Sequence, residues 1–145
     1  MSTNRCLYVL LVSSTASLVT LSAPAHYSYA QFDRCHPVSL EGDIQNVAWA
    51  NPHIVIDLRT VDETSYRVEW FNLQQLQNAG LATETLKTGD HVVITGAATR
   101  DPALRLVSLV SEIRRTSDGW SWTRPPRPVS PGCEAEAASA AKPTA

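Results

Sequence analysis

The sequence predicts an all-β domain, a small five-stranded OB-like barrel with one short helix between strands 3 and 4. Apolar side chains recur at every second position in five short segments, as in strands that bury one face. Between the third and fourth segments the period becomes helical. Three strands, a helix and two strands is the order of an OB-type barrel. An open β-sandwich is the alternative, because local periodicity does not fix closure.

The first strand is predicted to bend. Its apolar phase switches near Gln45 and Asn46, which indicates a bulge, and Gly42 would also permit a bend. The five predicted strands cover residues 38–49, 53–60, 66–71, 91–99 and 104–114. The side chains of the second strand predicted to point inward are Ile54, Ile56 and Leu58.

The predicted helix covers residues 73–79. Asn72 is a residue type that caps helix starts, and Gly80 is the type best able to take the left-handed conformation at a helix end. Leu73 and Leu76 lie on one face of this helix. We therefore expect them to plug the bottom of the barrel.

Residues 1–25 have the layout of a secretory signal peptide. Arg5 precedes an uncharged stretch that ends in small residues. Cleavage after Ala25 is the first choice and cleavage after Ala30 the second. An uncleaved membrane anchor is the alternative, since the stretch is long enough to span. The pattern predicts a periplasmic or secreted protein with no stable membrane insertion after cleavage.

The folded domain is predicted to cover residues 31–122. The Pro/Ala-rich residues 124–145 contain too few apolar side chains to offset ordering entropy, which predicts a disordered tail. Cys35 and Cys133 remain after signal removal, in a compartment where disulfides persist. The sequence is compatible with a disulfide bond between them and with two free thiols.

Charge argues against nucleic acid as a partner. The chain carries 14 acidic and 12 basic residues, for a net charge of -2, and neither sign runs in blocks. Removing Arg5 with the signal leaves 11 basic residues and a net charge of -3. Nucleic-acid binders normally carry a basic face. Oligonucleotide binding therefore ranks last among the functions considered.

Three segments resemble a family of small exported bacterial proteins classed as a domain of unknown function. Residues 25–33 are similar to its mature start, where a His-His-Ser-Phe-Ala run precedes Phe-Asp, although Tyr27 replaces the second histidine. Residues 47–53 resemble its Trp-x-Asn-Pro-His turn, and residues 80–96 contain its Leu-Lys-x-Gly-Asp run. The resemblance implies export and a small β-barrel, and it brings no activity.

The loop between the first two strands is a candidate ligand-binding loop. It contains Asn51, Pro52 and His53, and OB-type barrels use this loop at their ligand face. Arg100 and Asp101, between strands four and five, are expected to face the same mouth. The alternative is purely structural, because Asn-Pro is a common turn sequence.

A copper site is a second interpretation. If cleavage follows Ala25, His26 offers its α-amine and its ring nitrogen, and a ring from the fold would complete a three-nitrogen site suited to copper. His53 is the preferred metal partner and His36 the competitor. The alternative is a disordered N-terminal histidine that binds no metal.

The sequence favours a non-enzymatic binding module for a small ligand or a protein partner. Trp49 and Trp70 alternate with polar residues and are predicted to pack in the core rather than form a stacking platform. We identify no nucleophile beside a base and no Gly-rich phosphate loop in the sequence. A periplasmic copper-binding protein ranks second and an enzyme third.

Overall fold

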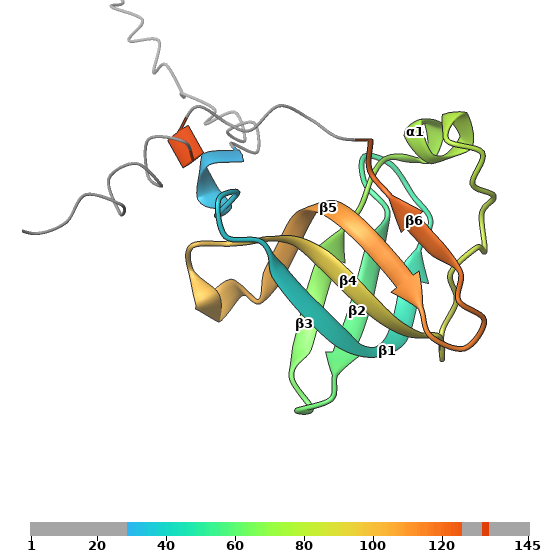
Figure 1. Cartoon of the computed structure of the whole chain (residues 1–145), viewed down its shortest axis with the longest axis horizontal. Coiled ribbons are helices and arrows are strands. Elements are labelled where there is room, and N and C mark those ends of the chain that lie inside the picture. The colour runs from blue at the N-terminus through green and yellow to red at the C-terminus, as the bar shows by residue number, and fades with distance from the viewer. Residues whose placement is uncertain (1–28, 126–131, 134–145) are drawn as a thin grey trace, which may run out of the picture.

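A computed structural model of the chain describes residues 29–125 and 132–133. These form one six-stranded sheet with one α-helix and two 3-10 turns (Figure 1). The elements are η1 (Tyr29–Gln31), β1 (Val38–Ala48), β2 (Val55–Thr60), β3 (Ser65–Glu69), α1 (Leu73–Asn78), β4 (His91–Ala98), η2 (Pro102–Leu104), β5 (Leu106–Arg115) and β6 (Ser121–Thr123).

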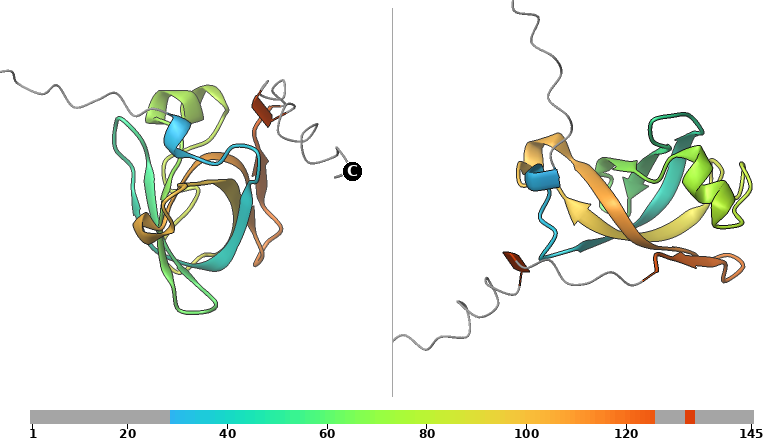
Figure 2. Two further views of the ribbon diagram at one scale, coloured as in Figure 1. Left: turned by 90° about the vertical axis from the view of Figure 1, so that its left-hand side faces the viewer. Right: turned by 90° about the horizontal axis from the view of Figure 1, so that it is seen from above.

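Strands β1 to β5 close into a barrel. The sheet order is β3-β2-β1-β4-β5-β6, and β3 also pairs with β5 in parallel. Two residue pairs make this closure, Arg67 with Leu106 and Val68 with Val107. The left view of Figure 2 shows the strands surrounding one centre. The predicted five-stranded barrel is confirmed.

Strand β1 bends where the sequence predicts. Its register with β2 shifts between Ile44 and Asn46, and its first half pairs with β4. At Gly42 a side chain would clash, since a Cβ atom would lie 2.1 Å from the carbonyl oxygen of Arg59. The bend lets one strand belong to both halves of the barrel.

Helix α1 lies between β3 and β4, as predicted. The Asn72 side chain accepts a 2.8 Å hydrogen bond from the Gln75 backbone N–H, and Gln75 Oε1 accepts from the Asn72 N–H in return. Gly80 follows the helix with a φ of 76°. Leu76 is fully buried in the core, while Leu73 is only partly buried against it.

The core fills the barrel and continues into an aromatic cluster at one side. The three inward residues predicted for the second strand are all buried. Trp70 packs edge-on against Trp122, with ring centroids 5.2 Å apart, and Trp49 lies 6.5 Å from Trp70. The core prediction is confirmed for Trp70, which is 2 % exposed, and Trp49 is partly buried against the core.

Strand β6 was not predicted. It has three residues, which is too short for a period to be recognised, and it pairs with the end of β5. Trp122 at its centre is 8 % exposed. The sixth strand therefore covers one side of the barrel with a single large side chain.

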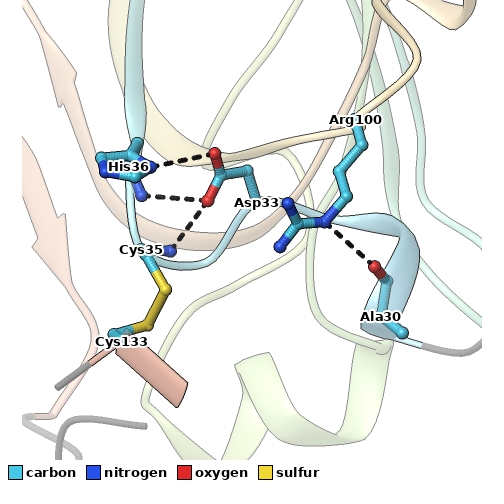
Figure 3. The surroundings of a disulfide bond; sticks show 6 residues. All are labelled: Ala30, Asp33, Cys35, His36, Arg100 and Cys133. Carbon is cyan, nitrogen blue, oxygen red and sulfur yellow. Dashed lines mark hydrogen bonds and ion pairs between the residues drawn. A yellow bond between two sulfur atoms is a disulfide. The ribbon is translucent and has the colours of Figure 1, made fainter. Parts of the chain in front are cut away.

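A disulfide joins Cys35 to Cys133, 98 positions apart in sequence (Figure 3). This settles the pairing that the sequence left open. The predicted signal peptide and most of the predicted tail lie outside the described residues. No helix within residues 29–125 and 132–133 is long and apolar enough to cross a membrane.

Candidate functional site

The barrel has a seam where β3 and β5 part. Beyond Val68 and Val107 the two strands no longer pair. Leu109 has a φ of 52°, and the register between β5 and β4 shifts at the same place, so β5 bulges here. A cavity of about 100 Å³ lies at this seam. Ser108 and Leu109 line one side of it, and Glu69, Trp70 and Phe71 line another.

An N-terminal arm, residues 29–37, contributes to the cavity lining. Phe32 is buried and bridges to Thr99, while Asp33 N–H donates to the Ala98 carbonyl over 2.8 Å. Through this attachment Tyr29 and Phe32 reach the cavity. Tyr29 stays 55 % exposed, so the cavity has an aromatic rim that solvent can reach.

Trp70 carries an unsatisfied donor. Its backbone N–H donates to the Ile54 carbonyl over 2.8 Å, but the indole Nε1 is buried and has no hydrogen-bond partner among the described residues. A buried polar group left in this state costs about 1–3 kcal/mol. Trp70 is also one of the residues that line the cavity.

Arg124 adds a cation to the cavity. Its guanidinium carbon lies 4.7 Å from the centroid of the Phe71 ring, a cation–π distance. Its backbone N–H donates to the Ser111 carbonyl over 2.8 Å, which fixes the chain just after β6. Phe71 in turn packs edge-on against Trp122, at 5.4 Å. The arginine therefore lines the cavity from a well-packed position.

Of the four predicted ligand-binding residues, His53 lines this cavity. Its side chain is half-buried, and Gln75 of α1 lines the same space. Asn51 lies exposed in the loop before His53 and does not line the cavity. Of Asn51 and His53, the loop thus supplies only His53 to the lining of the cavity.

Arg100 and Asp101 are occupied elsewhere. Arg100 Nε donates to the Ala30 carbonyl at 3.3 Å, and its backbone N–H donates to Gln31, so this residue holds the arm (Figure 3). Asp101 accepts from the Ala103 N–H at 3.0 Å and caps η2. Figures 1 and 2 place η2 and α1 at opposite ends of the barrel. The structure therefore does not bring these two residues to the mouth that His53 shares with α1.

The copper hypothesis depends on His26, which lies outside the described residues. Its partner His53 lines the cavity, whereas the competitor His36 bonds to Asp33 over 3.1 Å. That bond is the main reason why the pKa of Asp33 is lowered. Among residues 29–125 and 132–133, no group of three histidine, cysteine or carboxylate side chains is placed to hold a metal ion. Copper binding stays a prediction.

His91 forms a separate polar cluster on the barrel surface. Its Nδ1 lies 2.6 Å from Asp43 and its Nε2 lies 3.3 Å from Glu41. The hydrogen bond to Asp43, followed by that to Glu41, raises the pKa of His91. Both ring nitrogens of His91 are therefore hydrogen-bonded to carboxylates. We interpret the cluster as a group of charged side chains on a solvent-exposed strand face.

A groove of about 680 Å³ adjoins the cavity. It is bordered by β2, β3 and residues 103–106, and Glu69 lines both the groove and the cavity. Gln31 of the arm lines the groove, two positions from Tyr29 in the cavity. The cavity and the groove thus share one lining residue, Glu69, and residues of the arm border both.

Sequence reasoning missed most of the cavity. It placed Trp70 in the core, which is right, but a pattern of apolar residues does not show whether an indole N–H finds a partner. The predicted tail begins at Arg124, whereas in the structure Arg124 bonds to Ser111 of β5 and contacts Phe71; its position two residues after Trp122 continues the strand alternation. Tyr29 and Phe32 lie in a segment that resembles the family's mature start, but the segment has no strand or helix periodicity that would predict where it docks.

Comparison with protein families gives one match. Residues 14–105 match the model of a family described as a family of unknown function, DUF6152. Comparison with curated proteins and with solved structures found no match to this chain. The matched residues include the arm, strands β1 to β4, helix α1 and the 49–54 loop with His53. On this match, the chain belongs to the DUF6152 family of unknown function.

Proposed function

We propose that this chain is an exported, non-enzymatic binding module whose ligand places a hydrogen-bond acceptor in the cavity beside Trp70. The observation that carries the proposal is the buried indole Nε1 of Trp70, which has no partner among the described residues. We include export because residues 1–25 have the layout of a secretory signal.

The size of the cavity limits what enters it. Pockets for drug-sized ligands measure about 300–1,000 Å³, and this cavity measures about 100 Å³. It suits the small end group of a ligand rather than a whole one. Its lining combines aromatic rings with a few fixed polar groups, which is the usual composition of a recognition site.

The polar residues that line the cavity determine which kind of end group would bind there. The Trp70 indole can only donate, and so can the guanidinium of Arg124. Both can therefore bind an acceptor group of the ligand, such as a carbonyl or a carboxylate. His53 lines the same cavity and can donate from one ring nitrogen. The groups that would recognise the ligand come from three separate segments, which the fold holds in place.

The test is an NMR titration of the ¹⁵N-labelled, disulfide-bonded protein with sodium acetate and with acetamide at matched ionic strength. The four tryptophans give separate indole N–H signals, and Trp70→Phe assigns the one of interest. We expect that signal to shift with dissociation constants on the order of 1–10 mM, typical of ligands this small. The other three indole signals should shift less.

Variants identify the site. Arg124→Gln should weaken acetate more than acetamide, because it removes a charge that only acetate uses. Arg114→Gln is the matched control, since Arg114 is a strand arginine that is 58 % exposed and does not line the cavity. A Trp70 signal that neither compound moves at 100-fold excess would refute the proposal, and would favour a trapped water as the partner of the indole.

A further inference from the structure

The groove beside the cavity has the chemistry of a peptide-binding surface. Leu104 is 58 % exposed at its edge, and Tyr66 and Leu106 add apolar surface. Among its charged residues, Arg67 lies 3.6 Å from Asp57. The groove is thus lined by apolar side chains together with acidic and basic side chains.

The charges of the residues that line the groove favour a peptide over a nucleic acid or a glycan as its ligand. The groove is lined by two carboxylates, Asp57 and Glu69, and two guanidinium groups, Arg67 and Arg105. A nucleic-acid site would need an excess of basic groups for the phosphates. A glycan site would need several aromatic platforms, and Tyr66 is the only aromatic residue that lines the groove. Mixed charges beside aliphatic side chains match the side chains of a peptide.

The junction with the cavity indicates the direction of the peptide. Glu69 lines both spaces, so a chain that runs from the groove into the cavity passes this residue, whose carboxylate can accept a hydrogen bond from an amide N–H. Beyond it the cavity presents donors, the Trp70 indole N–H and the Arg124 guanidinium. An acceptor at that junction followed by donors suits a peptide end with an amide N–H and then a carboxylate.

We infer that the groove and the cavity together bind the C-terminal end of a partner polypeptide, with its carboxylate in the cavity and its preceding residues along β3. The inference rests on the proposed function and adds the class of ligand. β3 has five residues, so an extended segment of about five residues would match its length.

The experiment uses a pool of random N-acetylated pentapeptides, prepared with free C-terminal carboxylates and, separately, with C-terminal amides. Each pool is incubated with the disulfide-bonded protein, and bound members are identified by mass spectrometry. We expect the free acids to bind at least about tenfold more tightly than the matching amides, the effect of a lost charge-assisted bond. Bound acids should also shift the indole signal of Trp70 and the amide signals of residues 65–69.

Two pairs of variants locate the peptide. Leu104→Ala should weaken the selected peptides by about threefold to tenfold, because it removes exposed apolar contact. Val61→Ala should leave binding unchanged, since Val61 is 72 % exposed in the turn after β2 and does not line the groove. Arg67→Glu should change which peptides are selected, and Arg114→Glu should not. All four positions are exposed, so the variants are expected to fold.

The outcomes separate this inference from the proposed function. If acetate or acetamide shifts the Trp70 signal but acids and amides bind equally, or no pentapeptide binds, the peptide inference is wrong and the acceptor site stands. If a neutral oligosaccharide such as cellopentaose binds the groove and the peptides do not, the ligand is a glycan and the inference also fails. If neither small acceptor moves the Trp70 signal, both proposals fail.

Discussion

Two arginines near the C-terminal end of the barrel each lie beside an aromatic ring, and they differ in what else they contact. Arg115 lies 5.5 Å from the Trp120 ring centroid, and Arg124 lies 4.7 Å from that of Phe71. Arg115 also donates to the Thr85 carbonyl over 2.7 Å and to two carboxylates. Arg124 instead lines the cavity at the seam. An arginine beside an aromatic ring thus holds the turn between β5 and β6 together at Arg115, and lines the candidate site at Arg124.

At the end of the barrel around Arg115, which we call the locked end, the arginine forms ion pairs with two carboxylates. Arg115 bonds to Asp90 over 3.0 Å and to Asp118 over 2.7 Å, and Asp90 also accepts from the Lys87 N–H. The Arg115 hydrogen bond holds the pKa of Asp118 at about 2, and the bonds to Asp118 and Asp90 raise that of Arg115. At the seam, the Trp70 indole remains without a partner among the described residues. The two ends therefore differ in that the charged groups around Arg115 are paired, whereas a buried donor beside the cavity lacks a partner among the described residues.

The largest expected effect comes from removing the disulfide, which ties down the arm on the cavity side. A Cys35→Ser, Cys133→Ser variant should lose about 4 kcal/mol of unfolding free energy, since the bond closes a loop with a sequence separation of 98. Urea unfolding measures the loss. Amide exchange should rise most in residues 29–36 and least around Arg115. A uniform rise would show that the two ends are not independent.

Next in size is a direct comparison of the two arginines. Arg115→Met should cost about 2–4 kcal/mol, because it leaves Asp90, only 8 % exposed, without its partner. Arg124→Met should cost less, about 1 kcal/mol, because it removes a cation–π contact and keeps the backbone hydrogen bond to Ser111. Both values come from urea unfolding in parallel. Equal losses would mean that Arg124 is as structural as Arg115.

A smaller effect is expected for Trp70→Phe in the absence of ligand. The lost ring volume destabilises the core, but the variant also removes a buried donor that lacks a partner, so the net change should stay below about 1 kcal/mol. Trp122→Phe makes the same change beside it without removing such a donor, and should cost more. If Trp70→Phe costs more than Trp122→Phe, the indole N–H is satisfied in solution.

The smallest effect concerns pH at the locked end. The pKa of Asp118 is about 2 in the folded protein, below its ordinary value of 3.8. Its contribution to stability should therefore be complete above the ordinary value and disappear as the pH falls toward 2. Asp118→Asn should be slightly less stable than the wild-type protein at pH 6, and the difference should close between pH 4 and about pH 2. The carboxylate is exposed, so added salt should also reduce the difference. A difference that persists at pH 2 would exclude the ion pair as its cause.

Local signals in the sequence predicted the barrel well. The phase switch at Gln45, the Asn72 cap and Gly80 each act within a few residues, and the structure shows the bend, the capped helix and its end at those places. The register of β6 and the pairing of Cys35 with Cys133 depend on where distant segments meet, and no local pattern contains that information.

The candidate site was predicted only in part for the same reason. His53 can be placed at one end of the barrel by topology, because it lies in the loop between the first two strands, and it lines the cavity; its role in binding stays a prediction. Arg100 was expected nearby, but its N–H and side chain bind the arm, a segment whose docking has no periodic signal. Whether the indole N–H of Trp70 finds a partner depends on which residues the assembled barrel places around it, and no local pattern contains that information.

The disulfide makes a covalent ring of nearly the whole described domain. All of the strands from β1 to β6 lie between Cys35 and Cys133. A single cut by a protease at an exposed turn, such as the one at Val61, would therefore open the ring without separating the two pieces. Such a nicked molecule would run as one band on a non-reducing gel and as two after reduction. The bond would therefore hold the barrel together after a cut in one of its surface turns.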